Sequence, residues 1–90
     1  MLFMSIFSWE PDQRNEVIKR RMQGPGLPEG VKAIGEWVQI GGGRVFRLID
    51  IPDAKLGLAS ALPWTDIGYL ELLPVMDSEE AAKFAAQGQK

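Results

Sequence analysis

The apolar positions along the chain predict strands alternating with helices. Residues 2–8 are mostly apolar and aromatic, which is typical of a strand buried on both faces. Further strand patterns and segments with helical spacing follow one another to the C-terminus. The strands are expected at 31–40, 44–51 and 67–76, and the helices at 11–22, 53–62 and 78–86.

Turn and cap residues support these boundaries. Pro11 and the acidic residues beside it suit the first turn of a helix, where a missing N–H costs nothing and negative charge is favoured. The run Gly41-Gly42-Gly43 lies between two strand patterns and predicts a hairpin. Pro74 falls inside the last strand pattern, which places that strand at an edge of the sheet or at a bulge.

The order of the elements predicts an α+β fold, a ferredoxin-like βαββαβ sandwich with a short C-terminal helix. Ninety residues form a single domain, 1–90, and residues 87–90 are expected to fray. In this fold both helices cover one face of a four-stranded antiparallel sheet. The strand patterns are apolar on both faces, so we expect the open face to bind a second copy and form a homodimer.

The length of the glycine turn decides which side chains share a face. If 41–43 form a three-residue loop, Ile40 pairs with Arg44 and Trp37 lies opposite Arg47, on the open face of the sheet. A loop of another length shifts the register and reassigns both faces.

Composition excludes several classes of function. The chain has no cysteine and no histidine, which removes disulfides, thiol nucleophiles and the commonest metal ligands, so no metal or cofactor is expected. A net charge of −2 does not favour binding to nucleic acid. No stretch approaches the roughly 20 apolar residues of a membrane span, and we expect a cytoplasmic protein that does not bind membranes.

Arg47 is the leading candidate for a functional residue. A charge inside a central strand must be paired or must reach solvent. It is expected either to anchor an anion or carboxylate, with Trp37 stacked on the guanidinium, or to lie at the dimer interface paired with Glu36 or Glu71. Without histidine, these two glutamates are also the weak candidates for a general base.

Two further aromatic residues are candidates for lining a pocket. Tyr69 is the only tyrosine, and Trp64 lies in the loop that enters the last strand. Each side chain is expected either to contact a ligand or simply to pack against its neighbours. We therefore expect a homodimeric module, either structural or binding a small organic or anionic molecule, with a mostly apolar pocket on the open sheet face. The alternative is a cofactor-free enzyme acting on a small organic substrate.

Short motifs spread over nearly the whole chain carry a family resemblance. They are Ser8-Trp9-Glu10-Pro11, the stretch from Pro28 to Trp37, Gly42 to Phe46, Pro63-Trp64-Thr65-Asp66 and Pro74 to Asp77. In these the chain resembles a prokaryotic domain-of-unknown-function family related in appearance to the dimeric α/β-barrel proteins. The resemblance implies a dimeric barrel but no assigned activity. Enzymes of that architecture would make the alternative, a cofactor-free enzyme, isomerase- or monooxygenase-like. Similar sequences carry a histidine where this chain has Val38.

Overall fold

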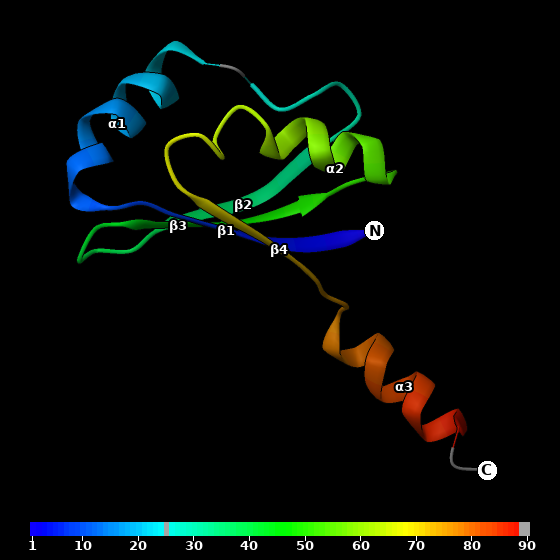
Figure 1. The fold of residues 1–90 in the computed structure, drawn as a ribbon. Coiled ribbons are helices and arrows are strands. Elements are labelled where there is room, and N and C mark those ends of the chain that lie inside the picture. Colours follow the sequence, from blue (N-terminus) through cyan, green and yellow to red (C-terminus); the bar gives the residue numbers. More distant parts are fainter. Residues whose placement is uncertain (25, 89–90) are drawn as a thin grey trace.

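The computed structural model describes residues 1–24 and 26–88. The chain order is strand β1 (Leu2–Ser8), the short 3-10 helix η1 (Pro11–Gln13), helix α1 (Arg14–Gln23), strands β2 (Lys32–Val38) and β3 (Arg44–Asp50), helix α2 (Ala54–Ala61), strand β4 (Tyr69–Pro74) and helix α3 (Ser78–Gly88). Figure 1 shows this order along the chain. The strands and helices follow one another as the sequence predicts, although β2 and β4 are shorter than expected.

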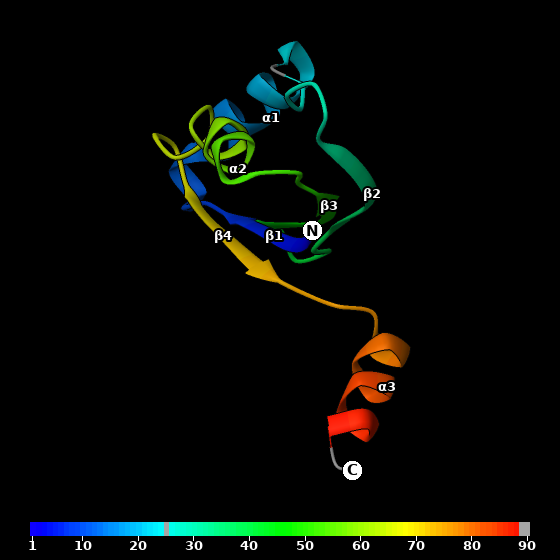
Figure 2. The same ribbon diagram turned by 90° about the vertical axis from the view of Figure 1, so that its right-hand side faces the viewer.

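The four strands form one antiparallel sheet in the order β2-β3-β1-β4. Helices α1 and α2 lie over the same face, and the opposite face is left open by them in both views (Figures 1 and 2). The structure thus confirms an α+β class with a four-stranded antiparallel sheet and is compatible with a ferredoxin-like fold. β4 is an edge strand, as Pro74 at its end predicts.

Local sequence explains where the two covering helices begin. Pro11 opens η1, which continues directly into α1. Asp53 is the N-cap of α2, and its carboxylate accepts a hydrogen bond from the Leu56 backbone N–H at 3.0 Å. Such a cap satisfies a donor that has no partner inside the helix.

The hairpin between β2 and β3 corrects the predicted register. The backbone N–H of Gln39 donates to the Arg44 carbonyl, so four residues rather than three form the loop. Gly42 and Gly43 each adopt a φ of 86°, a conformation that favours glycine. Trp37 consequently pairs with Phe46 and Glu36 pairs with Arg47.

The one-residue difference moves Trp37 and Arg47 to opposite faces of the sheet, because neighbouring side chains on a strand alternate. The expected stacking of Trp37 on Arg47 was therefore wrong. Trp37 lies on the open face, and Arg47 points toward the helices beside Glu36. The pocket predicted from this pair on the open face is not formed by them.

The hydrophobic core lies between the sheet and the covering helices. Ile49 and Ile51 are almost fully buried with Val31, and Phe3 and Leu72 pack against this cluster. The helices contribute little to it, since the only buried residues of α1 and α2 among those described are Val17 and Gly57. Larger apolar side chains remain exposed on both helices, among them Ile18, Met22 and Leu58, and so does Leu62 at the C-cap of α2.

Helix α3 stands apart from the rest of the domain. It projects away from the sheet on the side opposite α1 and α2 in both views (Figures 1 and 2). It continues to Gly88, two residues beyond the helix end expected near residue 86, and positions 89 and 90 of the segment expected to fray lie outside the described residues. Across the described chain, each helix is too short or too polar to cross a bilayer.

Candidate ligand-binding cavity

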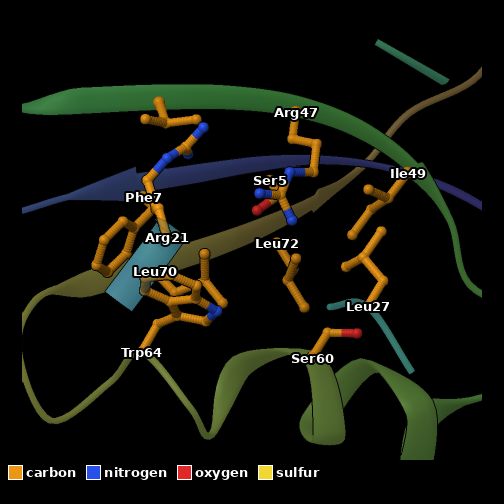
Figure 3. Close-up of a pocket in the computed structure, with 11 residues that line it drawn as sticks. Ser5, Phe7, Arg21, Leu27, Arg47, Ile49, Ser60, Trp64, Leu70 and Leu72 are labelled. Carbon is orange, nitrogen blue, oxygen red and sulfur yellow. The ribbon is translucent and has the colours of Figure 1, made fainter. Parts of the chain in front are cut away.

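A small cavity lies between the sheet and α2, and Figure 3 shows the side chains around it. Its volume is about 30 Å³, room for roughly one or two water molecules. Most of its wall is apolar, with polar groups from four side chains. The apolar wall is formed by Phe7, Leu27, Val45, Ile49, Trp64, Leu70 and Leu72, and the polar groups belong to Ser5, Arg21, Arg47 and Ser60.

A cluster of three charged side chains joins β2, β3 and α1 beside the cavity. The Arg47 Nε donates to Oε2 of Glu36 at 2.7 Å, and the Arg21 Nη2 donates to Oε1 of the same carboxylate at 2.6 Å. One negative charge is therefore shared between two positive charges. The cluster carries a net charge of +1 and lies at the edge of an apolar space.

The state of Glu36 follows from its two partners. Partial burial raises the pKa of the carboxyl group, but the hydrogen bonds from Arg21 and Arg47 outweigh that effect and hold the pKa below its ordinary value. The carboxylate is thus ionised at neutral pH and is a weaker base than a free glutamate. Its arrangement suits holding two guanidinium groups better than accepting a proton.

Arg47 keeps most of its hydrogen-bonding capacity for other partners. Among the described residues, no hydrogen bond engages its Nη1 or Nη2. The side chain extends from central strand β3 toward Ser5 and Leu72 (Figure 3), and three-quarters of its surface is buried. A guanidinium with two free amino groups at an apolar cavity is suited to binding a carboxylate.

Two hydroxyl groups add to the polarity of the cavity. Ser5 lies on β1 next to Arg47, its register partner on β3, and is buried. Ser60 lies on α2 across the cavity and donates from Oγ to the Leu56 carbonyl at 2.8 Å, which leaves its oxygen free to accept. The cavity thus offers both a cationic end and hydrogen-bonding groups.

The structure separates the residues predicted to form one site. Arg47 and Trp64 both line the cavity. Trp37 and Tyr69 lie on the open face and are more than half exposed. Glu71 also belongs to that face, because it alternates on β4 with the cavity residues Leu70 and Leu72.

Sequence reasoning missed Arg21, Ser5 and Ser60 as members of the cavity. Arg21 had a visible signal, since it lies on the same side of the predicted first helix as Val17. Ser5 and Ser60 had no such signal in the sequence, because a single serine in a strand or helix is common. Their role follows only from the pairing of β1 with β3 and from the position of α2.

A second ion pair holds the helical layer together at one end. Arg20 donates to the Asp66 carboxylate at 2.6 Å and to the Pro63 carbonyl at 2.7 Å. The hydrogen bond to Asp66 raises the pKa of Arg20, and the same contact lowers the pKa of Asp66. These contacts tie α1 to the loop that carries Trp64.

The chain belongs to the family named Domain of unknown function (DUF3303), whose model matches residues 1–89. No curated protein matches the sequence significantly. No solved structure matches the fold significantly. Family membership therefore rests on the sequence match, and any function must be argued from the cavity and the surfaces of this chain.

Proposed function

For this member of the DUF3303 family, we propose a homodimeric binding protein whose ligand is a small organic acid held between the sheet and α2. The observation that carries the proposal is the Arg47 side chain, which reaches an apolar cavity from a central strand with its Nη1 and Nη2 groups unengaged by the described residues. A partly buried guanidinium of this kind is stabilised when a carboxylate binds it. The ligand's acid group would bind Arg47 and its apolar part would contact Leu72 and Trp64.

Binding requires the cavity to widen, because about 30 Å³ holds little more than water. The helical layer is suited to such a movement. Each covering helix buries only one described residue, Val17 in α1 and Gly57 in α2, and α1 is tied to its surroundings by exposed ion pairs, which are individually weak. The ligand would therefore separate α2 from the sheet without unfolding the strands.

A titration with simple monocarboxylates tests this proposal. We expect affinity to rise from acetate to butyrate by about tenfold, since each buried CH2 contributes about 0.8 kcal/mol. NMR shifts of the Trp64 indole and of the Ser5 amide would report binding. Arg47→Met should abolish it, whereas Arg14→Met, which removes the same charge from an exposed position on α1, should not. Equal binding by both variants would exclude Arg47 as the anchor.

The open face of the sheet supports the dimer in this proposal. Side chains of β1 and β3 that alternate away from the cavity form an apolar strip there. The strip contains Met4, Ile6, Phe46 and Leu48, and Trp37 extends it onto β2 with 55% of its surface exposed. A contiguous apolar face of this kind is typical of an interaction surface, and two copies related by a two-fold axis would bury it with one self-complementary contact.

Sedimentation equilibrium tests the dimer with a matched pair of variants. Trp37→Lys places a charge on the open face, and Ile18→Lys places the same charge on an exposed apolar position of α1. We expect Trp37→Lys to shift the protein to a monomer and Ile18→Lys to leave the dimer intact. A wild-type protein that is monomeric at 100 μM would refute this part of the proposal.

The alternative of a cofactor-free enzyme requires a base near the cavity. Glu36 is the carboxylate closest to Arg47, but two guanidinium groups hold it and its pKa is lowered. Glu71 lies on the open face and is exposed. We therefore propose binding rather than proton transfer, and we assign Glu36 to positioning the two arginines.

A further inference from the structure

Helix α3 has an apolar side that has no partner among the described residues of its own chain. Ala81, Phe84, Ala85 and Gly88 follow the spacing i, i+3, i+4 and i+7, which puts them on one side of a helix. Phe84 is 75% exposed. The charged residues Glu79 and Lys83 fall on the other side, and Glu80 lies at the boundary, one turn before Phe84. We infer that this apolar side packs on a second copy of the chain and completes the dimer interface, an inference that rests on the proposed dimer.

An unsupported helix of this length is not expected to be stable. Isolated helices shorter than about 12–15 residues are marginal in water even with favourable sequences, and α3 has 11 residues. Asp77 caps it through the backbone N–H groups of Glu79 and Glu80, which contributes about 1 kcal/mol. Packing of Phe84 against another surface would supply the stabilisation that the cap alone does not.

The position of α3 identifies the second copy as that surface. The helix follows edge strand β4 and projects on the open-face side of the sheet (Figures 1 and 2). A sheet packed on this face would lie about 10 Å away. The three linker residues 75–77 span at most about 10 Å, and α3 is about 16 Å long. The helix therefore reaches past the sheet of a partner that is packed on the open face.

The area of the open face gives an independent reason for this contact. Four strands of about seven residues present roughly 450 Å² of sheet, or about 900 Å² over two copies. Stable interfaces bury about 1,200–2,000 Å² of accessible surface, and the flat area of the two sheets lies below that range. One side of α3 covers about 160 Å², and each docked helix buries about that area on itself and again on its partner copy. Two such helices add roughly 600 Å² in total. With α3 the interface reaches the usual range.

The dissociation constant of the dimer tests the inference on the full-length chain. Phe84→Ser removes the aromatic ring from the apolar side, and Lys83→Ser makes a similar truncation on the opposite side of the same helix. We expect at least tenfold weaker dimerisation for Phe84→Ser and less than a twofold change for Lys83→Ser, measured by sedimentation equilibrium. A dimer whose dissociation constant is equal in both variants would overturn the role of α3 while leaving the sheet-face dimer standing.

The absence of cysteine in the sequence allows a second, direct measurement. A nitroxide is attached to the cysteine of Gln87→Cys in protein that carries no isotope label. This protein is then mixed with isotope-labelled protein that carries no nitroxide. Broadening of the labelled Trp37 indole signal in the mixture shows that α3 of one copy lies against another copy. Broadening only when both labels are in the same chain would instead show that α3 folds back on its own sheet and would overturn the inference. A full-length chain that stays monomeric would refute the proposed dimer and this inference with it.

Discussion

Arg47 and Glu36 are register partners on β3 and β2, and the Arg47 Nε donates to the Glu36 Oε2 at 2.7 Å. The other carboxylate oxygen accepts from Arg21 on α1. A single glutamate therefore links the second strand of the hairpin to the helical layer. This link fixes the direction of the Arg47 guanidinium and leaves its Nη1 and Nη2 groups for the cavity.

Removing the charge of Glu36 should increase anion binding. In Glu36→Gln the two arginines keep their positive charges without the shared negative one, so the net charge of the cluster rises from +1 to +2. We expect monocarboxylate affinity to increase about three- to tenfold and stability to fall by about 1 kcal/mol, as for a partly exposed pair. NMR titration and urea unfolding measure the two effects.

Glu71→Gln is the matched control for that change. It removes the same charge from an exposed position on the open face, away from both arginines. Its monocarboxylate affinity should equal that of the unmodified protein. If both variants bind anions equally well, the effect comes from overall charge and not from the Glu36 cluster.

At acidic pH, the stability of the protein should depend on the ionisation of the Glu36 carboxyl group. The hydrogen bonds from Arg21 and Arg47 place the pKa of the folded carboxyl group below its unfolded value despite partial burial. This contribution is complete above the unfolded pKa, about 4.3, and is lost as the pH falls through the lower folded pKa. Asp66 has a lowered pKa for the same reason, beside Arg20.

Urea unfolding at pH 7, 5 and 3 measures this dependence. Wild-type stability should change little between pH 7 and 5 and then fall toward pH 3. Glu36→Gln lacks one of the titrating groups, so its stability should fall less over the same interval. Parallel curves for the two proteins would mean that Glu36 titrates normally in the folded state.

The alternation of apolar patterns was enough to predict the α+β class and the order of the elements. The patterns of β1 and β3 contain residues buried on the covered face, such as Phe7 and Ile49, and helix starts are marked by Pro11 and Asp53. Pro74 correctly indicated an edge strand. These signals are local, and local patterns specify strands and helices directly.

The candidate site was harder to predict because it depends on pairing between distant segments. Three glycines permit several loop lengths, and the Gln39–Arg44 contact that selects one of them leaves no local signal in the sequence. A difference of one residue exchanged the two faces of β2. Glu36 rather than Trp37 therefore accompanies Arg47, and Arg21 joins them through the position of α1.

Gly68 should tolerate no side chain at the start of β4. A Cβ there would collide with the Ser8 carbonyl oxygen and approach the Phe7 ring to 2.7 Å. Both belong to β1, whose backbone is held on both sides by neighbouring strands. We expect Gly68→Ala to lower the free energy of unfolding by at least about 2 kcal/mol.

Gly26→Ala provides the comparison for that substitution. A Cβ at Gly26 meets nothing within 4 Å, so the same added methyl group should change stability by less than about 0.5 kcal/mol. Thermal unfolding of both variants measures the difference. Similar melting temperatures would show that the Phe7 ring and the start of β4 adjust to each other more easily than their packing indicates.

The caps of α2 and α3 should differ in their effect on stability. Asp53 caps α2, which covers the cavity with Ser60, and Asp77 caps α3, which stands away from the body. Loss of an N-cap costs about 1 kcal/mol when the helix unfolds with the domain. Asp53→Ala should therefore lower the free energy of unfolding by about that amount. Asp77→Ala should reduce helicity without changing the unfolding midpoint of the dilute monomer, because α3 can unfold alone.

Circular dichroism at 222 nm and urea unfolding followed by tryptophan fluorescence separate the two effects. An equal loss of global stability in both variants would show that α3 packs on its own domain.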